Sequence, residues 1–259
     1  MPPIILPLEI EETILDLLAE DDKCHSALKT CSLVCKTFLP ICRKHIFERI
    51  SLNNAKLSPT TLAFHRLLCG TPEIADYIRV LRYDIQYEDL TIPSIQKSLK
   101  QISRLESLWI SNNSSLTPRL DWSNNPIRPA LLHLLHLPTL THLTMSIIDD
   151  FVISDLIACV NLKYLQIAHH MSVAAKNTFP VALPKNSIQL EEFDAGIRSN
   201  TVIMELCTAR RPDGQPVIDF GSVSKITAVT GQPEYGEPET SQMLFSCCHG
   251  LTDVNITCM

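Results

Sequence analysis

The sequence predicts an α/β protein in which a short all-helical N-terminal module precedes a curved solenoid with a parallel inner sheet. Three observations lead to this expectation. The first fifty residues carry apolar side chains at helical spacing. A short apolar motif then recurs seven times, and the stretches between its copies carry helical patterns of their own. We therefore expect a helical module over residues 1–50 and a domain of about seven irregular repeats over residues 51–259.

Two apolar stripes predict the helices of the N-terminal module. The first helix is started by Pro7, and its stripe consists of Ile10, Ile14, Leu15 and Leu18, since spacings of three and four return to one helix face. After a polar break at residues 21–23 the spacing resumes, and this second stripe consists of Leu28, Cys31, Val34, Cys35 and Phe38. Two or three short helices of this length hold too little chain to close a core, so we expect the module to need an outside partner.

The order of these residues closely resembles the F-box, the helical module that docks onto the Skp-type adaptor of cullin-RING ubiquitin ligases. The resemblance rests on the Leu-Pro opening, the Ile14-Leu15 pair and the block from Leu33 to Lys36. Phe38 stands where the family usually has tryptophan, and residues 23–26 look like additional loop. The resemblance implies a set of adaptor-binding residues: Leu6, Pro7, Ile10, Ile14, Leu15, Leu18, Leu28, Leu33, Val34, Cys35 and Phe38.

The apolar motif of the second part of the chain predicts its strands. One copy, with Leu105, Leu108, Ile110 and Asn113, meets the pattern Leu-x-x-Leu-x-Leu-x-x-Asn in full, and this pattern is typical of leucine-rich repeats. The copies begin 22 to 35 residues apart. The looser copies are Ile78, Leu81 and Tyr83; Leu140, Leu143 and Met145; Leu162, Leu165 and Ile167; Leu190, Phe193 and Ala195; Val223, Ile226 and Ala228; and Leu251, Val254 and Ile256.

Helical patterns fill the stretches between these strands. Ser58-Pro59 opens one helix that ends at Gly70, and further helices are expected over residues 129–137, 149–159, 201–209 and 238–248. Residues 111–128, 171–187 and 230–237 are expected to form loops. Strand and helix therefore alternate, which predicts a stack of units around a parallel sheet. The last strand, over residues 253–258, has no polar unit after it, so we expect the solenoid to lack a C-terminal cap.

The open face of this sheet is the predicted site for a protein target. Within each strand the residues that alternate with the motif positions point away from the core. Arginine, tryptophan and tyrosine are enriched at binding hot spots, so those side chains come first among the candidates. The candidate target-binding residues are Arg82, Trp109, Thr144, Tyr164, Gln166 and Asp194.

Composition and charge limit the kinds of partner. The formal net charge is -6 and the sequence has no basic run, which argues against binding to nucleic acid. No stretch approaches the ~20 apolar residues that cross a bilayer, so we expect no membrane contact. Acidic residues follow directly after Ile4 to Leu6 and no positive residue precedes them, so the N-terminus fails as a signal peptide. The ten cysteines are therefore expected to be reduced, as in the cytoplasm or the nucleus.

The sequence carries no motif of a known catalytic site. There is no phosphate-binding glycine loop, no nucleophile elbow and no His-Glu-x-x-His, so we expect neither an enzyme nor a cofactor. One alternative is a zinc-dependent or thiol enzyme, which would need Cys31, Cys35, Cys42 and His45 to converge. No Cys-x-x-Cys pair is present and apolar residues are interleaved as a helix requires, so we expect no metal.

An F-box-like module followed by leucine-rich repeats resembles the substrate-receptor subunits of Skp-cullin-F-box ubiquitin ligases, and it looks like the large F-box families of mushroom-type (basidiomycete) fungi. The resemblance implies that the N-terminal helices bind the adaptor, and through it a cullin-RING ligase, while the repeats hold a protein substrate. The alternative is a leucine-rich interaction or scaffold protein without ligase association. In that case Leu6, Ile10, Ile14 and Val34 would pack against Leu52 and the first repeat helix.

Overall fold

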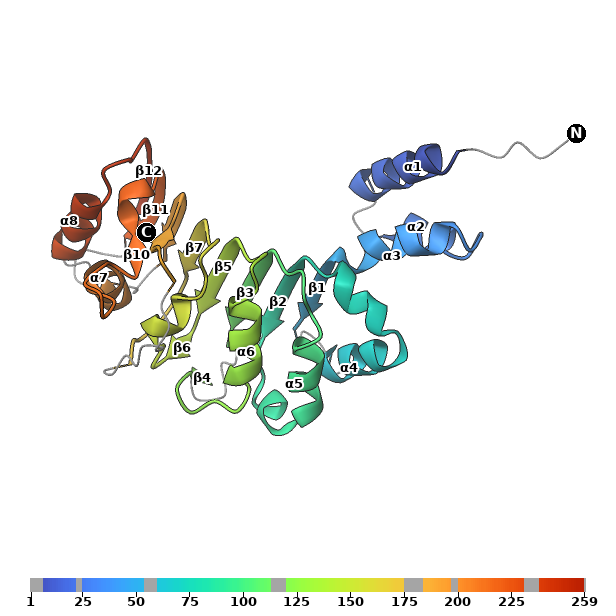
Figure 1. Cartoon of the computed structure of the whole chain (residues 1–259), viewed down its shortest axis with the longest axis horizontal. Coiled ribbons are helices and arrows are strands. Elements are labelled where there is room, and N and C mark those ends of the chain that lie inside the picture. Colours follow the sequence, from blue (N-terminus) through green and yellow to red (C-terminus); the bar gives the residue numbers. More distant parts are fainter. Residues whose placement is uncertain are drawn as a thin grey trace, which may run out of the picture.

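The computed structural model describes residues 7–21, 25–53, 60–112, 120–174, 184–196, 200–230 and 238–258. Its main feature is a parallel sheet of eight strands whose spatial order follows the chain. The strands lie side by side along an arc (Figure 1). They are β1 (Arg49–Leu52), β2 (Val80–Asp84), β3 (Ser107–Ser111), β5 (His142–Ser146), β7 (Tyr164–Ile167), β9 (Glu192–Ala195), β11 (Lys225–Thr230) and β12 (Asp253–Cys258).

The strand register places the seven copies of the motif at equivalent positions. Parallel pairing joins each strand from β2 to β12 to the next one in this order, so the seven predicted strands are confirmed. The middle motif positions form one continuous row of Leu81, Leu108, Leu143, Leu165, Phe193, Ile226 and Val254. The third positions form a second row of Tyr83, Ile110, Met145, Ile167, Ala195, Ala228 and Ile256.

Helices and short 3-10 turns connect the strands. The α-helices are α1 (Leu8–Asp21), α2 (Ser26–Cys31), α3 (Phe38–Glu48), α4 (Thr60–Gly70), α5 (Pro93–Leu99), α6 (Arg128–Leu135), α7 (Asn200–Thr208) and α8 (Pro238–Cys247). The 3-10 turns are η1 (Pro72–Tyr77), η2 (Tyr87–Thr91), η3 (Ile153–Leu156) and η4 (Phe220–Ser222). Two short parallel pairs lie outside the main sheet: β4 (Leu120–Asp121) with β6 (Ile148–Asp149), and β8 (Ile188–Gln189) with β10 (Ile218–Asp219).

Most of the predicted helices are confirmed, with one clear exception. The helices expected at residues 129–137, 201–209 and 238–248 correspond to α6, α7 and α8, and α4 begins just after Ser58-Pro59, which lies outside the described residues. The prediction of a helix over residues 149–159 is wrong, because the only helical segment in this stretch is the 3-10 turn η3. Asp150 has a φ of 53°, outside the right-handed helical region, so the backbone is not helical at this residue.

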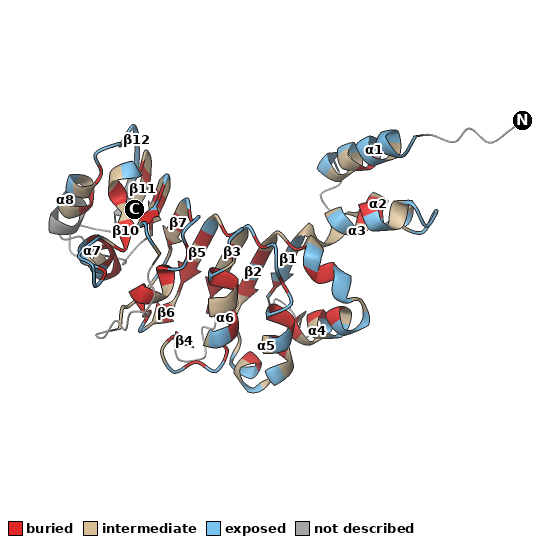
Figure 2. Cartoon of the chain, in the orientation of Figure 1, coloured by how far each residue is buried: buried red, intermediate tan, exposed pale blue. Residues whose placement is uncertain are grey.

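Two separate cores hold the chain together. The larger one joins the helices and turns on one side of the sheet to the motif residues of the strands. The smaller one lies between α1, α2 and α3 and consists of Leu15, Leu28, Ile41 and Cys42. In Figure 2 the buried positions run along the strands and the helices beneath them, whereas exposed and half-buried positions dominate α1 to α3. The N-terminal helices therefore have a small core of their own.

The first strand of the sheet differs from the sequence prediction, and the last strand is exposed on its core side. Strand β1 was not predicted, and it begins at Arg49, so the expected border between residues 50 and 51 falls inside this strand. At the other end, the core-side residues of β12 are open: Val254 is 45% and Ile256 is 50% exposed. No helix of the described residues is long and apolar enough to cross a membrane.

Candidate functional site

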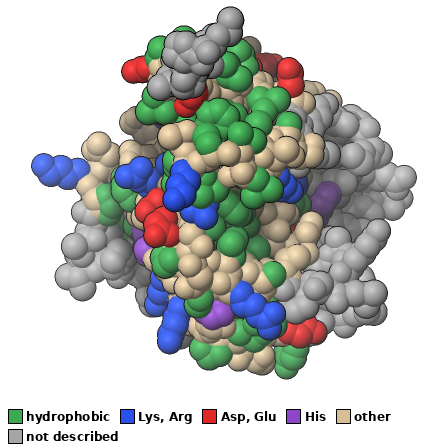
Figure 3. All heavy atoms as spheres, turned by 90° about the vertical axis from the view of Figure 1, so that its right-hand side faces the viewer, with side chains coloured by type: hydrophobic (Ala, Val, Ile, Leu, Met, Phe, Trp, Pro, Cys, Tyr) green, Lys and Arg blue, Asp and Glu red, His purple; other side chains and the backbone are tan. Residues whose placement is uncertain are grey.

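The N-terminal helices expose apolar side chains that the small core does not use. Ile10, Ile14 and Leu17 of α1 are 47%, 50% and 59% exposed. In the turn between α2 and α3, Leu33 is 86% and Val34 is 69% exposed. We call these five residues the N-terminal apolar surface. Figure 3 views the molecule from this end, and its green hydrophobic side chains gather in the upper half, where Figure 1 places α1 to α3.

Helical spacing explains why part of α1 is exposed and part is buried. Ile10, Ile14 and Leu17 are separated by four and three residues, so they share one face of the helix. Leu15 lies on another face and is buried against α2 and α3. Leu17 was missed by the sequence analysis, although the same spacing rule applied to Ile14 finds it.

The predicted adaptor-binding residues fall into three groups. Leu15 and Leu28 are buried in the small core, and Leu18 and Phe38 pack against it while half-buried. Leu6 lies outside the described residues. The exposed members are Pro7, Ile10, Ile14, Leu33, Val34 and Cys35. The structure thus brings six of the predicted residues to the surface of one small helical unit.

Polar contacts hold these helices to each other and to the sheet. The Nε2 atom of His45 in α3 lies 2.6 Å from the Oδ1 atom of Asp16 in α1. Helix α3 then runs directly into β1, and the backbone N–H of Arg79 donates to the carbonyl oxygen of Glu48 at 2.8 Å. The N-terminal apolar surface is therefore joined to the end of the parallel sheet.

Cys35 borders the N-terminal apolar surface, and local hydrogen bonds lower the pKa of its thiol. Its Sγ atom lies 2.9 Å from the hydroxyl oxygen of Thr37. This hydrogen bond is the main reason why the pKa of Cys35 is below its ordinary value, and the backbone N–H of Phe38 adds to the effect. The charge of Glu11 in α1 acts on the pKa of the same thiol with the opposite sign.

The second candidate surface is the face of the sheet that the helices leave uncovered, which we call the open strand face. All six predicted target-binding residues lie on it, at positions that alternate with the buried motif residues. Five of them form one row across neighbouring strands, and Tyr164 lies beside this row on β7. The row is Arg82, Trp109, Thr144, Gln166 and Asp194.

An arginine stacks on a tryptophan at one end of this row. The guanidinium carbon of Arg82 lies 3.8 Å from the centroid of the Trp109 ring. A cation over an aromatic face is attracted by the ring electrons, and stacking leaves the N–H groups at the guanidinium edge free to donate. Among the described residues no hydrogen bond or ion pair engages the Arg82 side chain, which is exposed.

Hydrogen bonds connect the other end of the row. The hydroxyl of Thr144 donates to Oε1 of Gln166 at 3.1 Å, and Nε2 of Gln166 donates to Oδ2 of Asp194 at 2.7 Å. The Tyr164 hydroxyl donates to the same Oδ2 atom at 3.4 Å. Burial raises the pKa of Asp194 above its ordinary value. Burial, and after it the charge of Asp194, raises the pKa of Tyr164 to about 12.

Further residues complete this end of the open strand face. The rings of His142 and Tyr164 lie 5.6 Å apart on adjacent strands. Nζ of Lys225 contacts Oε2 of Glu192 at 3.0 Å, and this hydrogen bond raises the pKa of Lys225 above its ordinary value. The face therefore carries Arg82 and Asp84 at one end, and Glu192, Asp194 and Lys225 at the other. Such a surface has donors and acceptors suited to binding a peptide segment.

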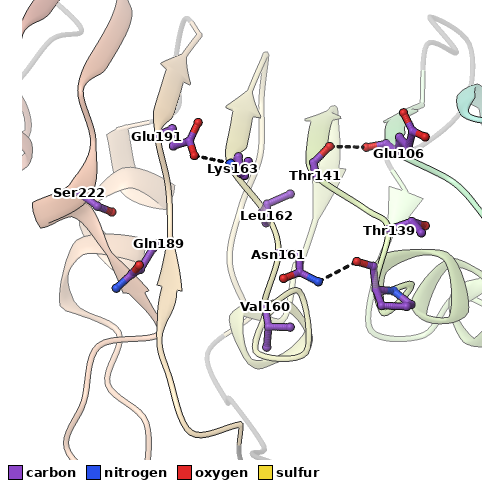
Figure 4. Close-up of a pocket in the computed structure, with 11 residues that line it drawn as sticks. Glu106, Thr139, Thr141, Val160, Asn161, Leu162, Lys163, Gln189, Glu191 and Ser222 are labelled. Carbon is purple, nitrogen blue, oxygen red and sulfur yellow. Dashed lines mark hydrogen bonds and ion pairs between the residues drawn. The ribbon is translucent and has the colours of Figure 1, made fainter.

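A hollow of about 720 Å³ lies at the amino-terminal ends of β3, β5, β7 and β9. Figure 4 shows that its polar groups face one another. Nζ of Lys163 contacts Oε1 of Glu191 at 2.5 Å, the Thr141 hydroxyl donates to the carbonyl oxygen of Glu106, and Asn161 donates to a backbone carbonyl. Because these groups satisfy one another, the hollow offers few unsatisfied groups to a ligand.

The zinc or thiol alternative finds no support in the geometry. In the part of the chain that the structure describes, no group of three or more His, Cys, Asp or Glu side chains could hold a metal ion. His45 is engaged by Asp16, and Cys35 is engaged by Thr37. Cys42 is buried in the small core, where burial raises its pKa. These side chains have separate local roles.

Comparisons with known proteins do not assign a family. No protein-family model matches the chain, and no curated protein matches it either. Two features of the chain therefore bear on its function: the N-terminal apolar surface and the open strand face.

Proposed function

We propose that the protein is the substrate-recognition subunit of a ubiquitin ligase of the Skp-cullin-F-box type. The N-terminal helices, as an F-box, would bind the Skp-type adaptor, and the strands, as leucine-rich repeats, would hold a protein target. The chain itself performs no chemistry in this proposal. It brings the target's lysines near a conjugating enzyme, so that catalysis is a matter of proximity.

One observation carries the proposal: a helical unit with its own small core exposes large apolar residues, among them the five of the N-terminal apolar surface. Exposed apolar patches of this kind mark sites of protein–protein contact. If the helices served only as a cap, Ile10, Ile14 and Val34 would pack against the first repeat, yet all three are exposed. The described cysteines are free thiols, in line with the reducing cytoplasm or nucleus where we expect the protein to act.

The experiment that tests the proposal measures binding to a purified Skp-type adaptor. We would compare the intact chain with a double variant, Ile14→Asp with Val34→Asp, because carboxylates forced into an apolar contact lose hydration. We expect the affinity to fall at least tenfold, which corresponds to roughly 1.4 kcal/mol. Both positions are exposed, so the fold should tolerate the change.

The matched control adds the same two charges at exposed hydroxyl residues of α1 and α2, as Thr13→Asp with Thr30→Asp. This control should keep the affinity of the intact chain. Equal losses in both double variants would indicate a general effect of charge, and no binding by the intact chain would leave a repeat protein that binds its target without a ligase.

A further inference from the structure

The Arg82 end of the open strand face is built to accept an anion. A guanidinium group has five N–H donors in a fixed plane, and here the plane is held by the Trp109 ring at 3.8 Å. The charge of Arg82 acts on Asp84 of the same strand, but no ion pair joins the two side chains within the described part of the chain. Arg82 therefore offers preoriented donors to a carboxylate brought by a partner.

The Asp194 end is built to accept a cation. Among the described residues, Gln166 and Tyr164 donate hydrogen bonds to this carboxylate, and both bonds go to the same oxygen, Oδ2. Lys225 is the nearby cation on the next strand, but its ammonium group contacts Glu192 instead. Among the described residues no cation forms an ion pair with the half-buried Asp194, although Lys225 acts on it electrostatically. An ammonium or guanidinium group placed at Oδ1 would stabilise this carboxylate further.

The distance between the two ends fixes the length of a ligand. Arg82 and Asp194 occupy equivalent positions on strands that are four steps apart, by way of Trp109, Thr144 and Gln166. Neighbouring strands lie about 4.8 Å apart, so the two side chains are separated by roughly 19 Å. An extended chain advances about 3.3 Å per residue, so roughly six residues cover this span.

We propose that the open strand face binds an extended protein segment with an acidic side chain at Arg82 and a lysine or arginine about six residues away at Asp194. The segment crosses the strands, and its middle lies over the side chains of Trp109, Thr144 and Gln166. This inference deepens the proposed function, because it names the chemistry of the target segment that the ligase subunit would hold. The charges of Arg82 and Asp194 fix the order of the two ends of the segment, since the opposite order places like charges together.

The test uses fluorescein-labelled peptides on a serine and leucine background, each with one glutamate and one lysine at a separation varied from about two to about ten positions. Fluorescence anisotropy with the full chain measures the affinity of each peptide. We expect the tightest binding near a separation of six, at least fivefold tighter than at the shortest separation. A separation profile without a maximum, or no peptide binding by the folded chain, would overturn the inference.

Variants assign the two ends. In Arg82→Gln the affinity should no longer depend on the glutamate of the peptide. In Asp194→Asn the affinity should no longer depend on the lysine of the peptide. Asp253→Asn neutralises an exposed carboxylate farther along the same sheet and should leave the profile unchanged. In the charge swap, Asp194→Lys should bind a peptide with glutamate in place of lysine at least fivefold better than the parent peptide. If Asp194→Lys does not prefer the peptide with the second glutamate, the placement of the peptide lysine at Asp194 is contradicted.

Adaptor binding is measured on the same preparations, so the two claims can fail separately. Adaptor binding without charge-dependent peptide binding would overturn the inference and leave the ligase proposal standing. A peptide profile with the expected maximum but no adaptor binding would support the inference as a property of the open strand face and remove the ligase role.

Discussion

Removing one buried leucine from the small core should unfold the N-terminal helices while the parallel sheet stays folded. Leu28 is fully buried and packs with Leu15, Ile41 and Cys42. In Leu28→Ala three buried carbons are lost, which at about 0.8 kcal/mol each gives about 2.4 kcal/mol. The unfilled cavity raises the cost toward about 5 kcal/mol. A core this small supplies no more than roughly 3–5 kcal/mol, so the loss is comparable to its whole stability.

Native-state hydrogen exchange followed by mass spectrometry measures this effect. We expect amides of α1, α2 and α3 to lose most of their protection in Leu28→Ala, while amides of β3, β5 and β7 keep theirs. The matched control is Leu143→Ala, a fully buried residue of β5 in the larger core, which should weaken protection of the sheet. Equal loss of protection in both regions after Leu28→Ala would refute the division into two cores.

Three further predictions concern single positions. In Gly196→Ala the new Cβ would lie 2.6 Å from the carbonyl oxygen of Ala168, so we expect a loss of about 1–3 kcal/mol in urea unfolding. Burial raises the pKa of Asp194, so this side chain favours folding below its ordinary pKa, and that contribution to stability is lost as the pH rises through the raised pKa. The difference in melting temperature between Asp194→Asn and the parent chain should therefore grow in favour of the variant from pH 3 to pH 7. The Thr37 hydroxyl lowers the pKa of Cys35, so Thr37→Val should slow iodoacetamide labelling of Cys35 at neutral pH, as counted by mass spectrometry.

Periodicity explains why most strands could be predicted from the sequence. In β3 and β7 the buried positions alternate with half-buried ones, and the conserved spacing within each repeat brings Leu108 and Leu165 into one row across the sheet. Even the weak copies with alanine at the third position, β9 and β11, hold the same register. Each short strand is stabilised by pairing with its neighbours. Because the motif recurs along the chain, these strands can be recognised from the sequence.

The parts that were missed lack such a pattern. Strand β1 has only Ile50 and Leu52 as apolar residues and follows α3 without a break, so its sequence looks like the end of a helix. The stretch after β6 has apolar residues at helical spacing, but its backbone turns through the left-handed region at Asp150 and forms only the 3-10 turn η3. Tertiary contacts, rather than local preference, decide both cases.

The candidate surfaces were predictable to different degrees. The alternation rule placed Arg82, Trp109 and Asp194 on the open strand face, but it could not show that Arg82 stacks on Trp109 or that Asp194 receives two hydrogen bonds. In the N-terminal helices the spacing identified apolar positions without separating the buried Leu15 from the exposed Ile14. That separation depends on how three short helices pack, and this is where the structure adds to the sequence.

The most direct test of the central claim is isothermal titration calorimetry of the full chain with a purified Skp-type adaptor at several temperatures. The account predicts a complex of one chain with one adaptor, with a negative heat-capacity change because Ile10, Ile14, Leu33 and Val34 leave water. Ile14→Asp with Val34→Asp should abolish or strongly weaken the binding signal. An intact, folded chain that shows no binding at any temperature would contradict the claim that the exposed apolar surface docks onto this adaptor.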